Sequence, residues 1–242
     1  MAPATGIPEA RSSGDREREE DEPLLGQPGD VAQKEEKGLG WNFLMGTASI
    51  AQAGIWILTA MVWASVLTNM KLSLFSAHPL ANSAGLLLST QAILVLQPTH
   101  LPKQKKQGTI IHALLNGAGL ASLITAGAIM FYLHRTSGHF ASIHGTMGLV
   151  TYIIFIIQSL VGFTQYYTPQ LYGSVENAKS VWKYHRMSGY VLLTLSLATV
   201  AAATQTPTGE NTLKLKLWAV LVCSVLTLVG VLPRIKKQKL GL

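Results

Sequence analysis

Four of the seven histidines in this chain stand near the start of long apolar stretches: His78, His112, His144 and His185. Neutral imidazole is a common ligand of metal ions, and it is also an axial ligand of haem iron. A single histidine in such a place would more simply reach toward the membrane surface. Four of them on consecutive apolar stretches indicate a cofactor site, because ionisable side chains are costly inside a membrane and are usually functional there.

Six stretches are apolar enough and long enough to cross a hydrocarbon core, which takes about 20 residues. They are residues 44–67, 79–96, 109–133, 143–166, 181–203 and 215–232. Prolines, which favour turns and helix ends, stand between several of them. The sequence therefore predicts an all-α, polytopic membrane protein with six transmembrane helices.

The basic residues predict that both termini lie in the cytoplasm. Six spans leave the two termini on one side, and cytoplasmic connections carry an excess of Lys and Arg. With the N-terminus inside, the inner connections and the C-terminal tail hold ten bases, against four in the outer connections. The inner bases are Lys103, Lys105, Lys106, Lys179, Lys183, Arg186, Arg234, Lys236, Lys237 and Lys239, and the outer ones are Lys71, Arg135, Lys214 and Lys216.

This topology sorts the four histidines into two pairs. The second and fourth spans run outside to inside, so His78 and His144 both lie near the outer surface. The third and fifth spans run the other way, so His112 and His185 lie near the inner surface. A haem iron takes one axial ligand from each face, and facing helices of a bundle can supply the two. We therefore expect a central four-helix bundle that holds two haem b groups, one in each leaflet.

Each candidate ligand also has a glycine on its own helix face. Gly85 and Gly119 stand seven residues after His78 and His112, and Gly148 and Gly189 stand four residues after the other two. Spacings of four and seven return to the same face of a helix. One explanation of these glycines is that they leave room for a porphyrin plane. The other is that they are ordinary small residues that let neighbouring spans pack closely.

Composition argues against other chemistries. After residue 40 the only acids are Glu176 and Glu210, so paired-carboxylate catalysis and Mg²⁺ sites lack their side chains. A zinc or copper site would need four convergent ligands or carboxylate helpers, and a histidine proton relay usually works with Asp or Glu. The bases lie between apolar runs and not on one soluble face, so we expect the lipid bilayer and no nucleic acid as a partner.

Residues 1–40 differ from the rest of the chain. They hold ten of its twelve acids and are rich in Arg, Gly and Pro. Such a segment cannot bury enough apolar surface to offset its ordering entropy, so we expect a disordered cytoplasmic tail at 1–40 and a membrane domain at 41–242. The run from Glu20 to Leu25 is similar to an acidic di-leucine sorting signal, which would direct the protein to endosomal or vacuolar membranes.

At the histidines the chain resembles the cytochrome b561 family of six-span, di-haem transmembrane oxidoreductases. The matching stretches are Leu74-Phe75-Ser76-Ala77-His78-Pro79, Ile111-His112, Ser142-Ile143-His144-Gly145 and Tyr184-His185-Arg186-Met187-Ser188-Gly189. The resemblance covers about residues 41–240, and it implies the same pairing of ligands that the topology predicts. It also implies an ascorbate-dependent oxidoreductase of the ferrireductase or monodehydroascorbate reductase type. Such a protein passes electrons from cytoplasmic ascorbate through two haems to monodehydroascorbate or ferric iron on the other side.

The resemblance also implies where substrates bind. Basic side chains just before the inner ligands serve ascorbate in the family, which points here to Lys106 and Lys179, with Lys105 and Lys183 as helpers. The often basic position two residues before His112 is Ile110, a departure from the family's pattern. On the outer side the candidates for acceptor contacts are His134, Arg135 and His139.

Two other functions remain open at this point. One is a haem-binding anchor subunit of a larger redox complex, which would need a soluble partner chain for its electrons. The other is a carrier without haem, although carriers often have internal repeats and helices broken at mid-membrane by Gly or Pro. The family resemblance leaves both a monomer and a homodimer open.

Overall fold

The computed structural model describes residues 31–136, 138–236 and 240 of the chain. Within them the long helices are α2 (Ala48–Asn69), α3 (Leu74–Leu96), α4 (Pro102–Leu133), α5 (Ile143–Tyr167), α7 (Trp182–Ala203) and α8 (Leu217–Val231). Short pieces join or flank them, namely η1 (Leu39–Phe43), η2 (Pro169–Tyr172), α6 (Val175–Ser180), η3 (Thr208–Leu213) and η4 (Leu232–Arg234). The described residues form no strand.

Among the described residues, six helical segments are long and apolar enough to cross a membrane, which confirms the predicted all-α polytopic fold. Three helices begin four or more residues from the predicted start: α2 begins at Ala48, four residues later than predicted, and α3 and α4 begin earlier. The α3 helix begins at Leu74, five residues earlier than predicted, because Ser73 and Ser76 cap it reciprocally ahead of Pro79. The α4 helix begins at Pro102, since its polar first turns are helical although they are not apolar. Its 32 residues extend about 48 Å, longer than a hydrocarbon core of about 30 Å.

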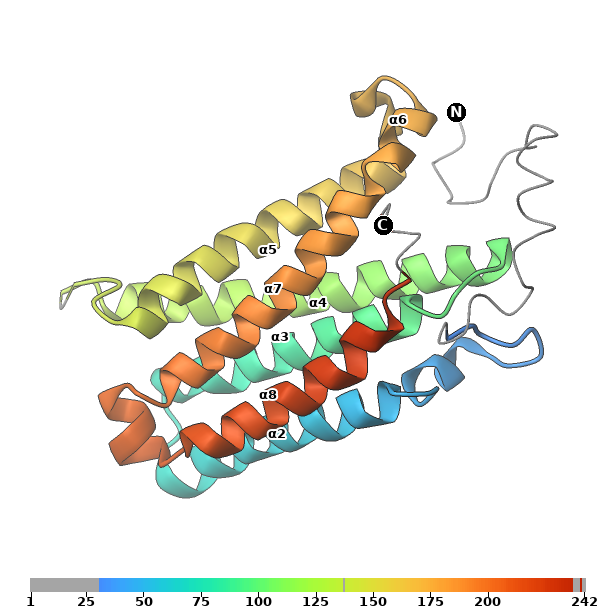
Figure 1. The fold of residues 1–242 in the computed structure, drawn as a ribbon. Helices are drawn as coiled ribbons and strands as arrows, with labels where there is room; N and C mark the ends of the chain where they lie inside the picture. The colour runs from blue at the N-terminus through green and yellow to red at the C-terminus, as the bar shows by residue number, and fades with distance from the viewer. Residues whose placement is uncertain (1–30, 137, 237–239, 241–242) are drawn as a thin grey trace, which may run out of the picture.

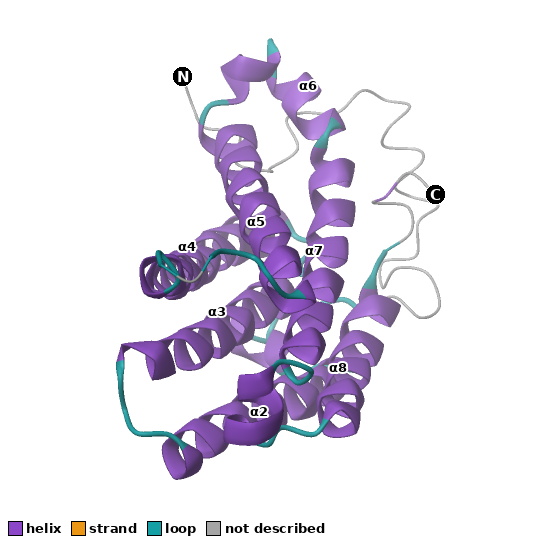
Figure 2. Cartoon of the chain, turned by 90° about the vertical axis from the view of Figure 1, so that its left-hand side faces the viewer, coloured by secondary structure: helices purple, strands orange, loops and turns teal. Residues whose placement is uncertain are grey.

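The six helices lie in three layers (Figures 1 and 2). The α2 and α8 helices form one outer layer, α3 and α7 lie in the middle, and α4 and α5 form the other outer layer. Gly54 allows α2 and α8 to cross closely, because a Cβ there would stand 2.6 Å from the carbonyl oxygen of Cys223. The layers therefore enclose the middle pair, α3 and α7, which carry one candidate ligand each.

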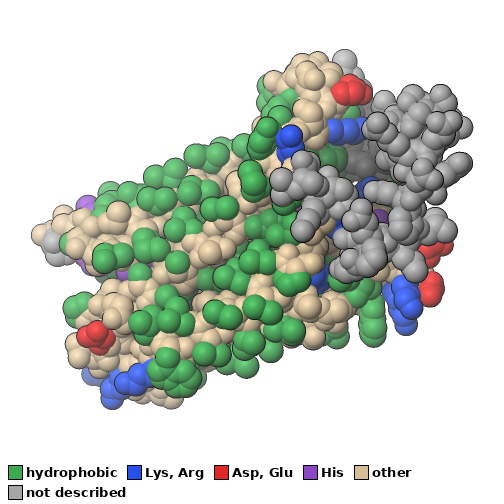
Figure 3. Space-filling view, in the orientation of Figure 1, with side chains coloured by type: hydrophobic (Ala, Val, Ile, Leu, Met, Phe, Trp, Pro, Cys, Tyr) green, Lys and Arg blue, Asp and Glu red, His purple; other side chains and the backbone are tan. Residues whose placement is uncertain are grey.

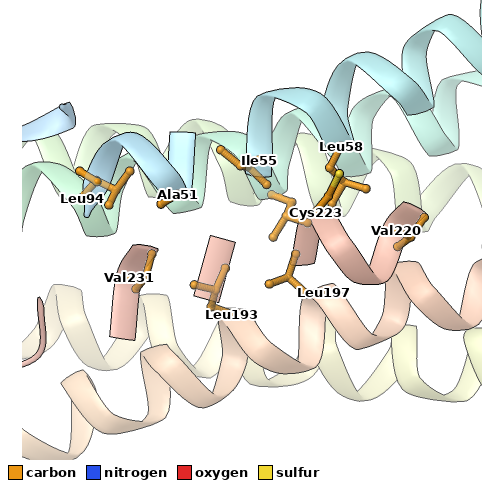
Figure 4. Close-up of a cluster of buried hydrophobic side chains, with 11 residues drawn as sticks. Ala51, Ile55, Leu58, Leu94, Leu193, Leu197, Val220, Cys223 and Val231 are labelled. Carbon is orange, nitrogen blue, oxygen red and sulfur yellow. The ribbon is translucent and has the colours of Figure 1, made fainter. Parts of the chain in front are cut away.

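The main hydrophobic core lies between the α2/α8 layer and the middle layer (Figure 4). Its side chains come from α2, α3, α7 and α8, and they include Ile55, Leu94, Leu197 and Val220. On the outside, α4 and α5 expose large apolar side chains such as Leu114, Phe131, Ile157 and Leu160. Exposed apolar surface of this kind suits contact with lipid tails.

The two ends of the bundle differ in charge. We call one the basic end: it comprises the described residues before α2, the connection between α3 and α4 with the first turns of α4, η2, α6, the first turns of α7, and η4 with the two residues after it. Hydrogen bonds from Gln33 to Pro98 and from Arg234 to Asn42 tie its segments together. The opposite end comprises the α2–α3 and α4–α5 connections and η3. Figure 3 shows hydrophobic side chains over the middle of the visible face and Lys and Arg toward its ends.

Ten of the fourteen bases after residue 40 belong to the basic end in the predicted topology. Lys237 and Lys239 lie outside the described residues, and so does the di-leucine pattern between Glu20 and Leu25. The side of the membrane that each end faces stays a prediction.

Candidate functional site

His78 on α3 and His144 on α5 face each other. Their ring centroids are 6.1 Å apart and their planes are nearly perpendicular, at 87°. A metal–imidazole bond is about 2 Å long, so two imidazoles on opposite sides of one metal ion place their centroids about 6 Å apart. The separation of this pair therefore suits two axial ligands of one iron.

Backbone carbonyls fix the tautomer of three of the four candidate ligands. The Nδ1 atom lies 3.1 Å from the Ala126 oxygen in His78, 2.8 Å from the Ala92 oxygen in His112 and 2.9 Å from the Thr199 oxygen in His144. A carbonyl only accepts hydrogen bonds, so Nδ1 must carry the proton and Nε2 keeps its lone pair. Histidine ligands of metals are commonly oriented in this way by a hydrogen bond from the other ring nitrogen.

His185 completes the set in a different environment. Its Nδ1 atom is buried and has no hydrogen-bond partner. Its ring packs against Gly162 of α5, where a Cβ would stand 2.8 Å from the Cε1 atom. His112 is close enough to interact electrostatically with it. A buried ring nitrogen without a partner fits a site completed by a bound group.

Two asparagines that the sequence reasoning missed lie next to the α3 and α4 histidines. Asn82 Nδ2 is 3.2 Å from His78 Nδ1, and Asn116 Nδ2 is 3.2 Å from His112 Nε2. The Tyr152 hydroxyl donates to Asn82 Oδ1 at 2.8 Å, which links α5 to the His78 environment. The signal was present in the sequence, because both asparagines stand four residues after a candidate ligand.

The α3 and α4 helices repeat one arrangement in opposite directions. Both have the pattern His-x₃-Asn-x₂-Gly, with a 34-residue offset between His78 and His112. The same offset separates Gly85 from Gly119. It also separates the carbonyls at Ala92 and Ala126, each of which accepts from the histidine of the other helix. The two helices therefore form an inverted repeat.

The explanation of the glycines as room for a porphyrin is wrong for Gly85 and Gly119. A Cβ on Gly85 would stand 3.0 Å from the Gly119 oxygen, and a Cβ on Gly119 would stand 3.1 Å from the Gly85 oxygen. These glycines thus allow α3 and α4 to cross closely, as small residues do between membrane helices. Gly189 faces Gln158 Nε2 at 3.1 Å, whereas Gly148 meets only the Thr199 methyl at 3.9 Å.

The candidate ascorbate lysines all lie at the basic end. Lys106 is exposed on α4, the helix that also carries His112, whereas Lys105 is half-buried there. Lys179 is on the short α6 helix, which ends at Ser180 before α7 begins, so its six-residue offset from His185 does not follow one continuous helix. Lys183 is exposed on α7 with its ammonium 5.2 Å from the Tyr184 ring.

The candidate acceptor contacts lie at the opposite end and make local interactions. His134 Nδ1 lies 3.1 Å from the Met130 oxygen, and its ring is close enough to interact electrostatically with His78. The Arg135 guanidinium lies 4.2 Å from the Tyr132 ring centroid. His139 stacks on Phe131 with centroids 4.2 Å apart. Of the three, His134 is therefore the one that interacts electrostatically with His78.

Among the described residues, no three His, Cys, Asp or Glu side chains converge on a point that could hold a metal ion. Two-ligand sites remain, which is the coordination that a haem requires because its porphyrin supplies the other four nitrogens. The fold and these pairs define a polytopic membrane protein with histidine pairs suited to haem.

Comparison with known sequences identifies the family. The sequence model of the eukaryotic cytochrome b561 family matches residues 77–208, more than half of the chain and all four candidate ligands. The chain belongs to this family. Its cofactor type, haem b, follows from that membership, and the buried, oriented imidazoles described above fit it.

Several curated proteins are similar to the chain. A probable transmembrane ascorbate ferrireductase 4 of Arabidopsis thaliana is 30% identical over 144 residues, 58% of this chain and 59% of the relative. A transmembrane ascorbate-dependent reductase of Homo sapiens is 25% identical over 167 residues, 66% of this chain and 63% of the relative. A probable ascorbate-specific transmembrane electron transporter 1 of Oryza sativa subsp. japonica is 31% identical over 136 residues, 54% of this chain and 56% of the relative. The chain thus spans less than two thirds of the length of each.

Proposed function

We propose that the chain transfers electrons across a membrane through two b-type haems, from ascorbate at the basic end to an acceptor at the opposite end. Haem iron supplies one-electron chemistry by alternating between its ferrous and ferric states. The observation that carries the proposal is the approach of the His78 and His144 rings to 6.1 Å, with both Nδ1 atoms turned to backbone carbonyls. The names of the similar proteins refer to ascorbate and to electron transport, and they support the same reaction.

In this proposal the histidines act in two pairs. His78 and His144 hold the outer haem, and His112 and His185 hold the inner one. The backbone acceptors at Ala92, Ala126 and Thr199 fix the rings, so that little reorganisation is needed when the charge on the iron changes. The α4, α5 and α7 helices also share a buried apolar cluster of Leu123, Phe155 and Leu192, which in this proposal would lie between the two haems.

The basic end would receive the donor. Ascorbate is an anion at neutral pH, and a basic rim raises its local concentration and steers its approach. Lys106 and Lys179 would bind it, with Lys105 and Lys183 as helpers. One electron leaves ascorbate, which becomes monodehydroascorbate and releases a proton to water.

The opposite end would deliver the electron. Either monodehydroascorbate takes it up with a proton and becomes ascorbate, or ferric iron is reduced to ferrous iron. His134, Arg135 and His139 would contact that acceptor. We propose the cytoplasm for the basic end and both termini, with residues 1–40 as a tail and 41–242 as the membrane domain. Glu20 to Leu25 would then direct the protein to endosomal or vacuolar membranes.

Haem content and reduction by ascorbate test the proposal together. We expect a pyridine haemochrome assay on the purified protein to give two haems per chain. We also expect ascorbate alone to reduce them in proteoliposomes with an acceptor trapped on the far side. A ratio near zero would favour a carrier without haem. Two haems that ascorbate reduces only when a partner chain is added would favour an anchor subunit.

A further inference from the structure

A buried arginine at the basic end lacks a counter-charge. The Arg234 side chain on η4 is only 3% exposed. Its Nη2 atom donates to the backbone oxygen of Asn42 at 3.2 Å, but its Nε and Nη1 atoms are buried without any hydrogen-bond partner. A buried charge of this kind is costly unless an opposite charge and hydrogen bonds compensate it.

The protein supplies no carboxylate for this purpose within the part that the structure describes. The carboxylates there belong to Glu35, Glu36, Glu176 and Glu210, and all four side chains are exposed. None of them is hydrogen-bonded to Arg234, whose side chain donates to the neutral carbonyl of Asn42. An anion that compensates the Arg234 charge would therefore come from outside these residues.

A second arginine points to the same place. The Tyr190 hydroxyl on α7 accepts a hydrogen bond from Gln97 Nε2 at 3.1 Å. Both Arg186 and Arg234 are close enough to interact electrostatically with that hydroxyl. Gln97 Nε2 also lies 3.1 Å from the Val231 oxygen, so the ends of α3 and α8 meet there beside α7. Two guanidinium groups thus lie within electrostatic range of one phenol, and an excess of positive charge of this kind favours a carboxylate as its partner.

The position of this cluster relates it to the inner pair of histidines. Arg186 directly follows His185 on α7, and Tyr190 stands one helical turn further along. Gln97, which caps the end of α3, follows Ala92, whose carbonyl orients His112, by five residues. The cluster is therefore built on the two helices that carry or orient the inner ligands. Because Arg234 is buried, a lipid headgroup at the membrane surface is a poorer source of the anion than a group inside the bundle.

We propose that Arg234, Arg186 and Tyr190 bind a propionate carboxylate of the inner haem. Haem b carries two propionates, which are its only ionised substituents, and a guanidinium binds a carboxylate through two parallel hydrogen bonds. The two positive charges also favour the reduced haem, which is one unit more negative than the oxidised one. This assignment rests on the proposed function, because it needs a haem between His112 and His185.

Redox titration of the full-length haem protein, in detergent and without ascorbate, tests the assignment. We expect Arg234→Gln to lower the midpoint potential of one haem and to leave the other unchanged. In a His78→Ala background, which retains only the inner haem, the same downward shift should appear. Arg234→Lys, which keeps the charge, should restore most of the potential. Lys103→Gln, an exposed change at the same end, is the matched control and should move neither haem.

Three results would overturn the assignment. The first is haem with unchanged potentials in Arg234→Gln. The second is an equal shift in the Lys103→Gln control. The third is a wild-type potential that changes with added acetate or with anionic lipid in nanodiscs, if Arg234→Gln loses that dependence. The site around Arg234 would then bind an exchangeable anion and not a haem propionate. A wild-type protein without haem would refute the proposed function itself. Failure of the propionate assignment and failure of the proposed function therefore give different results.

Discussion

Replacing Gly162 by alanine is the sharpest test of His185 as a haem ligand. Gly162 is on α5, and the added methyl would stand 2.8 Å from the Cε1 atom of the His185 ring. Ordinary van der Waals contact begins at 3.4 Å, so the ring or the helix must move by about 0.6 Å. A ring that is free to rotate would move away at little cost, whereas a ring held by iron could not.

The expected size of the effect follows from that displacement. Metal–ligand distances tolerate about 0.2 Å, so a shift of about 0.6 Å strains or breaks the bond. Overpacking of a well-packed site costs about 1–3 kcal/mol. If this overpacking energy destabilises only the haem-bound protein, the affinity for the inner haem drops by about 5- to 150-fold. Under the proposed function the outer haem is held by His78 and His144, so its affinity should not change.

The assay is the haem-to-protein ratio after purification, combined with a redox titration that resolves the two haems. We expect Gly162→Ala to retain one haem fully and to lose part or all of the other. Gly117→Ala is the matched control, because a Cβ there meets nothing within 4 Å. Two haems with wild-type spectra and potentials in Gly162→Ala would refute the reasoning that His185 is a ligand.

Three further changes test other parts of the site. His78→Ala should remove only the outer haem and His112→Ala only the inner one, as absorption spectra would reveal; identical spectral losses in the two variants would contradict the pairing. Tyr152→Phe removes one buried hydrogen bond beside the outer pair, so we expect about 0.5–1.5 kcal/mol lower stability in denaturant unfolding and an altered EPR signal of the outer haem alone. Lys106→Gln combined with Lys179→Gln should slow stopped-flow reduction by ascorbate and flatten its salt dependence at unchanged haem content; a wild-type rate would mean that these lysines serve only membrane topology.

The number and approximate position of the membrane helices were predictable because hydropathy alone carries that information. Helix starts were less predictable where polar residues continue a helix beyond the apolar run. Ser73 caps α3 before the predicted start at Pro79, and the turn from Pro102 to Lys106 extends α4 beyond the membrane core. Both extensions depend on local capping and helix propensity, to which a count of apolar residues is insensitive.

The approach of His78 to His144 was predictable from the direction of the spans, because alternate helices bring equivalent ends together. The backbone acceptors at Ala126 and Thr199 were not, since any residue type supplies a carbonyl and only the packing selects which one. The buried state of Arg234 was equally hidden, because in the sequence it reads as one more base of a cytoplasmic tail. Such features arise from tertiary contacts that no spacing rule encodes.

The inverted repeat of α3 and α4 has a consequence for direction. Turning these two helices end over end exchanges His78 with His112 and Ala126 with Ala92, so under the proposed function an electron would meet much the same ligand frame from either side. The α3 and α4 part of the frame therefore sets no preferred direction, whereas His144 and His185 differ in their surroundings. The direction of electron transfer would then depend on the membrane potential and on which reductants and oxidants bind at each end of the bundle. Electrons would pass in the opposite direction if the donor were supplied at the other end.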